Sequence, residues 1–298
     1  MSDPERFLLS FDVGGSHATA ALIRVGSLEL LAVASNPLDT QGPAEEVLGG
    51  LEAVGKQVLA GYPDAELQGI AVAIPGPFDY AEGIFRIRNL TKYDDLYGVN
   101  LRTALAERFP SVAPEAVRFL NDAQAALLGE VHCGVAVGVS RVMGLTLGTG
   151  LGSAFVVDGR IVTSGPGVPP EGYVYCLPWN GGTIEDEISA RGLQRRYQTL
   201  TGGQCEVRDI AARARTGGDA VAMSVWQEFG KILGAALLPV VSGFRPEVIV
   251  LGGGIAQSSE LFLPVAESLL EGLGVSLRPS TLLDRAALFG AAVAWQGS

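Results

Sequence analysis

Three glycine-rich turns, far apart in the chain, have the composition of a polyphosphate-binding site. Each follows a short apolar run, and their sequences are DVGGS at 12–16, LGTGLG at 147–152 and LGGG at 251–254. Glycine permits a positive φ and leaves no Cβ between the backbone and a ligand. Backbone N–H groups clustered in such turns form a concavity that binds anions. Because the first turn begins with an acidic residue and the second carries a hydroxyl, the pattern predicts a bound nucleotide.

Asp122 is the candidate catalytic group. It lies directly after a predicted strand at 117–120 and begins a predicted helix at 122–131. An Asp at such a place is favoured as a helix N-cap whatever the function. A carboxylate there could also accept the proton of a substrate hydroxyl that attacks a phosphorus atom. The residues alone leave both interpretations open.

Two side chains in the turns suit phosphate chemistry. Asp12, beside Gly14 and Gly15, could hold Mg²⁺ directly or through water, because hard cations prefer oxygen ligands. It could also simply close a strand. Thr149 could donate a hydrogen bond from its hydroxyl to a phosphate, whereas a plain turn needs no hydroxyl at this position.

The apolar pattern places these residues at the ends of strands in two related α/β halves. Strands and helices follow a βββαβ order, and a second βββ run starts near residue 141, which describes mixed sheets. We therefore expect two lobes with a nucleotide cleft between them. The predicted strands are 7–13, 17–25, 28–36, 67–74, 117–120, 141–147, 152–157, 160–163 and 247–251. The predicted helices are 43–61, 100–108, 122–131, 184–200, 206–213, 217–241, 256–273 and 284–296.

Composition argues against several other classes of protein. The 298 residues are 48% hydrophobic and 18% charged, with a net charge of −11. Nucleic-acid and anionic-membrane binding are disfavoured, since both need a basic face. The chain opens on no signal-peptide pattern, and its apolar runs are too short to span a membrane. The three cysteines are widely spaced, so neither a disulfide framework nor a CxxC zinc site is expected, and a reducing cytoplasm is the predicted location.

An ordered series of motifs carries a resemblance that covers nearly the whole chain. The motifs are FDVGGS at 11–16, AIPGPFD at 73–79, NL at 89–90, LNDAQAALLGE at 120–130, LGTGLG at 147–152 and VLGGGI at 250–255. In this order they resemble the ROK family of bacterial sugar kinases and repressors, within the actin-like ATPase and hexokinase group. The resemblance implies an α/β, two-lobed actin-like ATPase (ribonuclease H-like) fold with mixed five-stranded sheets. It also implies an N-terminal lobe at 1–120, on which a last helix at 284–298 packs back, and a C-terminal lobe at 121–283.

The resemblance further implies a role for each motif. Asp122 would be the general base that deprotonates the primary hydroxyl of a hexose, and Asp12 would position Mg²⁺. The sugar contacts would come from Asn89, Asn121, Asp122, Glu171, Pro75 and Gly76. The phosphates of ATP would bind at Gly14, Gly15, Ser16, Gly148, Thr149 and Gly150, and the adenosine would lie by Gly252, Gly253 and Gly254. A homodimer would be the assembly, with neither nucleic acid nor a membrane as partner.

Departures from the family pattern concern the second lobe. Most members carry a Cys-x-Cys-Gly-x-x-Gly-Cys zinc cluster, where this chain has PWNGGTIEDE at 178–187, so we expect no structural zinc. The family's Glu-x-Gly-His contacts the sugar and the zinc, whereas EGYVYC at 171–176 has no histidine. Glu171 or Tyr173 could supply the sugar contact instead. The segment KYDD at 92–95 is expected to be a solvated loop, with a place at the rim of the sugar pocket as the alternative.

The sequence therefore predicts ATP-dependent transfer of the γ-phosphoryl group to a hexose, with the 6-hydroxyl of glucose favoured. An N-acetylhexosamine or fructose kinase, a polyphosphate-using glucokinase and a non-catalytic sugar sensor remain alternatives. A long polyphosphate would favour a basic groove, which the net charge of −11 makes less expected. A transcription regulator of the same family would need an N-terminal helix-turn-helix, for which the first predicted strand leaves no room.

Overall fold

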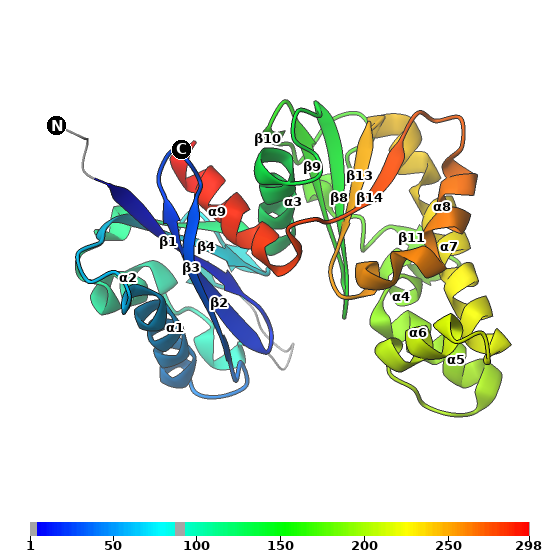
Figure 1. Cartoon of the computed structure of the whole chain (residues 1–298), viewed down its shortest axis with the longest axis horizontal. Coiled ribbons are helices and arrows are strands. Elements are labelled where there is room, and N and C mark those ends of the chain that lie inside the picture. The colour runs from blue at the N-terminus through cyan, green and yellow to red at the C-terminus, as the bar shows by residue number, and fades with distance from the viewer. Residues whose placement is uncertain (1–4, 87–92, 298) are drawn as a thin grey trace. The chain divides into compact units, whose positions relative to one another are not determined.

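The computed structural model of the chain describes residues 5–86 and 93–297. Its contacts divide the chain into two compact units (Figure 1). The first unit consists of the residues up to Gly129 together with those from Arg285 onward, and the second is Glu130–Asp284. The first unit is therefore discontinuous in sequence, because the last helix returns to it.

A five-stranded mixed sheet forms the centre of the first unit, in the order β3-β2-β1-β4-β7. β1 (Arg6–Val13) pairs antiparallel with β2 (His17–Arg24), which pairs antiparallel with β3 (Leu30–Pro37). β4 (Glu66–Ile74) lies parallel to β1, and β7 (Val117–Asn121) lies parallel to β4. The carboxyl ends of β1, β4 and β7 therefore share one edge of the sheet.

Helices cover both faces of this sheet, because β1 buries side chains on both sides. On one face Phe7, Leu9 and Phe11 pack with α1 (Ala44–Leu59) and α2 (Leu101–Arg108). On the other face Leu8 packs with α9 (Ala286–Gln296), which Figure 1 shows beside β1 and β4. The core of the unit therefore has two layers, one on each side of the sheet.

α3 (Asp122–Cys133) follows β7 directly and packs against α9. Glycine permits the close approach, since a Cβ on Gly290 of α9 would overlap the carbonyl oxygen of Ala125. Likewise a Cβ on Gly129 would overlap the carbonyl oxygen of Ala286. This contact fixes the first turns of α3, which begin at the candidate base.

The second unit repeats the sheet arrangement in the order β10-β9-β8-β13-β14. β8 (Arg141–Leu147), β9 (Leu151–Val157) and β10 (Arg160–Ile161) pair antiparallel. β13 (Val248–Gly252) lies parallel to β8, and β14 (Ser276–Pro279) lies parallel to β13. The predicted mixed five-stranded sheets are therefore confirmed.

The long helix α7 (Ala220–Phe244) runs through the core of the second unit. Its Trp226 and Phe229 pack against Phe262, with ring centroids 5.9 and 5.1 Å away.

Among the described residues, no helix has both the length and the apolar character needed to cross a bilayer. The other helices are α4 (Ile184–Glu187), α5 (Ala190–Thr201), α6 (Val207–Arg215) and α8 (Leu263–Leu270). The short elements are β5 (Phe78–Asp79), β6 (Ile84–Phe85), β11 (Pro178–Trp179), β12 (Gly182–Thr183), η1 (Asp94–Leu96), η2 (Pro114–Ala116), η3 (Pro170–Gly172), η4 (Ile255–Leu261) and η5 (Leu283–Arg285).

Two predicted helices are interrupted in the structure. The helix predicted at 184–200 divides into α4 and α5, because the Ser189 hydroxyl accepts the Gly192 N–H at 3.3 Å and starts a new helix. The helix predicted at 256–273 divides into η4 and α8, with Phe262 in a non-helical conformation between them. Pro264 stands in the first turn of α8, where its missing N–H is tolerated.

Candidate active site

The carboxyl edge of the first sheet collects Asp12, Pro75, Gly76, Asn121 and Asp122. Asp12 lies near the end of β1, Pro75 and Gly76 follow β4, and the remaining pair joins β7 to α3. The register puts Asp12 opposite Ala73 of β4, whose neighbour Ile74 is opposite Asn121. The parallel pairing thus brings these predicted site residues, distant in sequence, to one edge.

Asn121 caps helix α3. Its Oδ1 accepts the backbone N–H groups of Ala123 and Gln124 at 3.1 and 3.2 Å. Its Nδ2 donates to the hydroxyl of Tyr80 at 3.2 Å. The capping role that the sequence allowed for Asp122 is therefore taken mainly by the residue before it.

Asp122 is partly buried, and the pKa of its carboxyl is raised. Desolvation by the surrounding protein raises this pKa, while hydrogen bonds from the backbone and from Asn121 act in the opposite direction. One carboxylate oxygen accepts the Ala123 N–H at 2.9 Å. Because a raised pKa means a higher proton affinity, this carboxylate is suited to act as a general base.

The β1–β2 turn at 14–16 lies in the same neighbourhood. The Gly14 N–H donates to the carbonyl oxygen of His17 at 3.0 Å and closes the turn. The Tyr93 hydroxyl donates to the carbonyl oxygen of Gly14 at 2.6 Å. Burial raises the pKa of the Tyr93 phenol, and the negative charges of Asp122 and Asp12 raise it further. Both carboxylates therefore lie close enough to this phenol to act on it.

Tyr80 and Tyr93 show what sequence reasoning missed around this edge. Both lie between β4 and α2, where no periodic pattern marks an element. Tyr93 is only 2% exposed, so the solvated-loop interpretation is wrong for this residue. Long-range contacts identify both residues: the sequence raised the segment at 92–95, with Tyr93, only as a possible rim of the sugar pocket, and it gave no signal for Tyr80. Asn89, a predicted sugar contact, lies outside the described residues.

In the second unit the β8–β9 turn presents Thr149 at an exposed tip. The Gly148 N–H donates to the carbonyl oxygen of Gly150 at 3.1 Å, and the Ala190 N–H donates to that of Gly148 at 2.8 Å. A Cβ on Gly150 would lie 2.8 Å from a carboxylate oxygen of Glu185. A side chain at 150 would therefore displace the Glu185 carboxylate, which accepts the Leu151 N–H at 2.9 Å.

The third turn lies next to the second. Gly253 has a φ of 84°, and a Cβ there would overlap the carbonyl oxygen of Leu147, which precedes the second turn. The expectation of a positive φ is correct at this residue and wrong for the other glycines of the three turns. These are Gly14, Gly15, Gly148, Gly150, Gly152, Gly252 and Gly254. At Gly148, Gly252 and Gly254 a Cβ would also meet no protein atom closer than 3.8 Å, so neither the dihedral angle nor the packing of the described residues requires glycine there.

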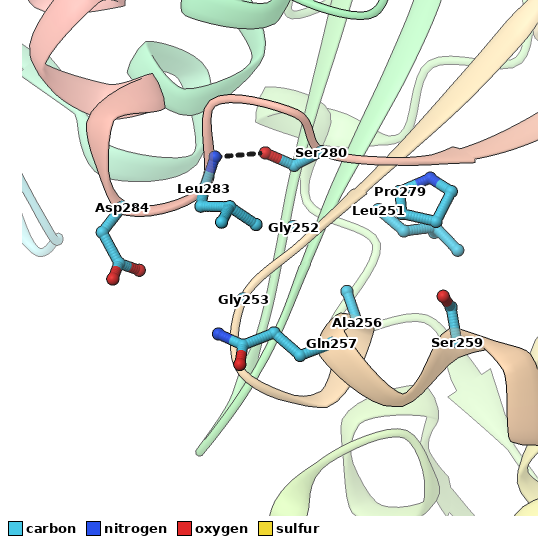
Figure 2. Close-up of a pocket in the computed structure, with 10 residues that line it drawn as sticks. All are labelled: Leu251, Gly252, Gly253, Ala256, Gln257, Ser259, Pro279, Ser280, Leu283 and Asp284. Atoms are coloured by element: carbon cyan, nitrogen blue, oxygen red, sulfur yellow. Dashed lines mark hydrogen bonds between the residues drawn. The ribbon is translucent and has the colours of Figure 1, made fainter.

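A pocket of about 180 Å³ opens beside Gly252 and Gly253 (Figure 2). One wall is the turn after β13 with the start of η4, and the other is the segment from Pro279 to Asp284. Gln257, Asp284 and two serines, Ser259 and Ser280, add polar side chains to a lining whose other residues are glycine or apolar. Pockets that bind whole drug-sized ligands have volumes of roughly 300–1,000 Å³. This smaller pocket therefore has the size for one ring system of a nucleotide.

Glu130 fixes one wall of this pocket. Its buried carboxylate accepts the hydroxyls of Ser280 and Thr281, the latter at 3.2 Å, and the Leu282 N–H at 2.8 Å. The Ser280 hydroxyl in turn accepts the Leu283 N–H at 2.9 Å (Figure 2). A buried carboxylate with its hydrogen bonds satisfied holds a segment rigidly, so this wall is preformed.

Glu171 and Tyr173 belong to the second unit, on and after η3. Glu171 is exposed and has a φ of 57°. Ser153 of β9 anchors the segment by donating to the carbonyl oxygen of Gly172 at 2.6 Å and accepting the Val174 N–H at 2.9 Å. Whether Glu171 or Tyr173 contacts a sugar stays a prediction.

Asp12 offers the donor chemistry of a magnesium site, since it is a carboxylate near the end of β1, just before the first glycine turn. Among the described residues, no three side chains of His, Cys, Asp or Glu gather closely enough to hold a metal ion. Whether Asp12 contacts Mg²⁺ stays a prediction.

Comparison with known proteins decides the family. The sequence profile of the ROK family matches residues 8–298. This chain belongs to the ROK family. It is 27% identical to the glucokinase of Thermotoga maritima, with 97% of each chain covered. It is also 29% identical to the N-acetyl-D-glucosamine kinase of Pectobacterium atrosepticum, over 65% of this chain and 67% of that one.

A solved structure supports the fold of this ROK protein. The ROK family glucokinase of Streptomyces griseus, in complex with glucose and AMPPNP, superposes with a TM-score of 0.77. The two chains are 22% identical, and the match covers 98% of this chain and 100% of the other. The predicted family, the two-lobed actin-like ATPase fold and the hexose-kinase class are therefore confirmed.

Proposed function

We propose that this ROK protein phosphorylates glucose at its 6-hydroxyl, with ATP as the donor. The observation that carries the proposal is the position of Asp122, a carboxylate of raised pKa at the sheet edge that also holds Asp12. A proton acceptor beside a phosphate-binding turn is what activation of an alcohol toward phosphorus requires. The similarity to the glucokinase of Thermotoga maritima supports glucose as the sugar.

Asp122 accepts the hydroxyl proton as the sugar oxygen attacks the γ-phosphorus. A bond forms between that oxygen and phosphorus, the bond from phosphorus to the bridging oxygen breaks, and ADP leaves with the electron pair. The products are glucose 6-phosphate, ADP and a proton on Asp122, which passes to solvent. Little covalent chemistry falls to the protein, so positioning and electrostatics supply most of the acceleration.

The glycine turns hold the phosphates through their remaining backbone N–H groups, because those of Gly14 and Gly148 already donate within their own turns at 3.0 and 3.1 Å. The proposed phosphate contacts are Gly14, Gly15 and Ser16 of the first turn and Gly148, Thr149 and Gly150 of the second. The pocket beside Gly252, Gly253 and Gly254 takes the adenine end of ATP. The AMPPNP bound to the Streptomyces glucokinase supports ATP as the donor.

Asp12 orients the Mg²⁺ that accompanies ATP. When bound, the ion neutralises charge on the phosphates. On the sugar side, Asn121 and Asp122 join β7 to α3, Pro75 and Gly76 follow β4, and Asn89 and Glu171 complete the proposed contacts. We expect the enzyme to be a homodimer.

A substrate panel tests this proposal. Formation of ADP from ATP and magnesium is followed with glucose, N-acetylglucosamine, mannose and fructose, and glucose is expected to have the highest kcat/KM. The similarity to the Pectobacterium enzyme makes N-acetylglucosamine the second candidate, and a preference for it would replace glucose. Equal, near-background rates with all four sugars would contradict a hexose kinase.

A further inference from the structure

The carbonyl oxygens of the first glycine turn are each held by a hydrogen-bond donor. The Gly14 oxygen accepts the Tyr93 hydroxyl at 2.6 Å. The Gly15 oxygen accepts the Thr40 hydroxyl at 2.9 Å, and the Ser16 oxygen accepts a backbone N–H at 2.9 Å. All three donors belong to residues that come after β2 in the sequence. The conformation of the turn is therefore held by hydrogen bonds from other segments.

Tyr93 and Thr40 are also joined by a backbone hydrogen bond. The Tyr93 N–H donates to the carbonyl oxygen of Thr40 at 2.7 Å. The two residues are 2% and 3% exposed, and the Tyr93 ring packs on Phe85 with centroids 5.5 Å apart. Tyr93 has a φ of 60°, a left-handed conformation that a bulky residue adopts only when its surroundings impose it.

Fixing a carbonyl oxygen also fixes the next N–H, because the two point in opposite directions across a trans peptide. The Tyr93 hydroxyl therefore sets the direction of the Gly15 N–H, and the Thr40 hydroxyl sets that of the Ser16 N–H. Neither N–H finds an acceptor among the described residues. If either peptide flipped, a carbonyl oxygen would replace a donor and repel an anion.

We propose that Tyr93 is a positioning residue for the phosphates of the nucleotide, acting through the Gly14–Gly15 peptide, with Thr40 as its counterpart at the Gly15–Ser16 peptide. The inference rests on the proposed binding of ATP at this turn. It assigns these two buried hydroxyls to the binding of ATP rather than to the binding of the sugar. Burial raises the pKa of this phenol, and the carboxylates of Asp122 and Asp12 raise it further, so the hydroxyl keeps its proton and remains a donor at neutral pH.

The test is Tyr93→Phe, which removes the hydroxyl and keeps the ring on Phe85. We expect KM for ATP, and the dissociation constant of ATP with magnesium measured by calorimetry, to rise about three- to tenfold. KM for the hexose should stay unchanged. The matched control is Tyr62→Phe, because the Tyr62 hydroxyl also donates to a backbone carbonyl, that of Leu31 at 3.1 Å, away from the turn.

Thr40→Val provides an independent second variant, and Thr40→Ser restores the hydroxyl. We expect the first to weaken ATP binding as Tyr93→Phe does and the second to rescue it. Unchanged ATP affinity in Tyr93→Phe, or equal shifts in both KM values, would overturn the inference, as would the same effect in Tyr62→Phe. Weaker ATP binding in Tyr93→Phe would support it even if the wild-type protein phosphorylated no sugar, an outcome that would remove only the proposed reaction.

Discussion

The ionised carboxylate of Asp122, which the proposed general base requires, destabilises the folded protein. Because burial raises its pKa in the folded protein, ionisation is harder there than in the unfolded chain. The destabilisation is absent below the unfolded pKa and becomes complete as pH rises through the folded pKa. A buried carboxyl at this position therefore costs stability wherever it ionises, which agrees with a functional rather than a structural role.

Asp122→Asn should separate these two effects. We expect kcat to fall by about 10²- to 10⁴-fold, because general-base assistance is lost. The thermal midpoint at neutral pH should equal or exceed that of the wild type, and the difference should shrink as pH falls through the raised pKa. Asp64→Asn is the control, since Asp64 is exposed in the same unit. Turnover near the wild-type rate in Asp122→Asn would eliminate the assigned base.

Among the turns, the third depends most on glycine. Gly253 combines a positive φ with backbone contact to Leu147, so it joins the ends of β8 and β13. The next residue, Gly254, has a φ of −63°, and a Cβ there would meet no atom within 4 Å. The two neighbouring glycines thus face different constraints within one turn.

Gly253→Ala should destabilise the protein by roughly 1–3 kcal/mol, because the added Cβ is strained in a left-handed conformation and overlaps backbone. ATP affinity should fall as well, since the residue lines the pocket. Gly254→Ala should leave the unfolding free energy nearly unchanged. Urea denaturation of both variants measures the difference, and equal stabilities would show that the turn relaxes freely.

At the scale of the whole molecule, the two units have separate cores. The cluster around α7 draws all its buried residues from Met143 to Leu277, within the second unit. The clusters of the first unit combine β1 with α1 on one face and with α9 on the other. A unit with its own core can fold alone. Asp122, the candidate base, belongs to the first unit, so the second unit alone lacks it.

Residues 130–284, expressed alone, should therefore unfold cooperatively and bind ATP without phosphorylating glucose. The isolated unit keeps the pocket and the second and third turns and lacks the base and the first turn. Circular dichroism on heating and calorimetry with ATP are the measurements, with the same unit carrying Gly253→Ala as the control. A gradual melt with no nucleotide binding would show that the units are interdependent.

By itself the sequence determined the family and the mixed sheets, and it singled out the glycine turns and Asp122 as candidates for the site. These signals are local, since an apolar run, a Gly-Gly pair or an Asp after a strand can be recognised within about ten residues. The same local signals failed at Ser189 and Phe262, where capping and packing interrupt helices that periodicity alone continues.

Only the tertiary structure decided which side chains hold the site in shape. Tyr93 reaches the first turn across 79 residues, and Glu130 reaches the pocket wall at Ser280 across 150. Asn121, rather than Asp122, proved to be the main cap of α3 through a choice between neighbouring polar groups. Such contacts depend on how strands pair and helices cross, and a hydroxyl or carboxylate looks the same in sequence whether it faces water or a buried carbonyl.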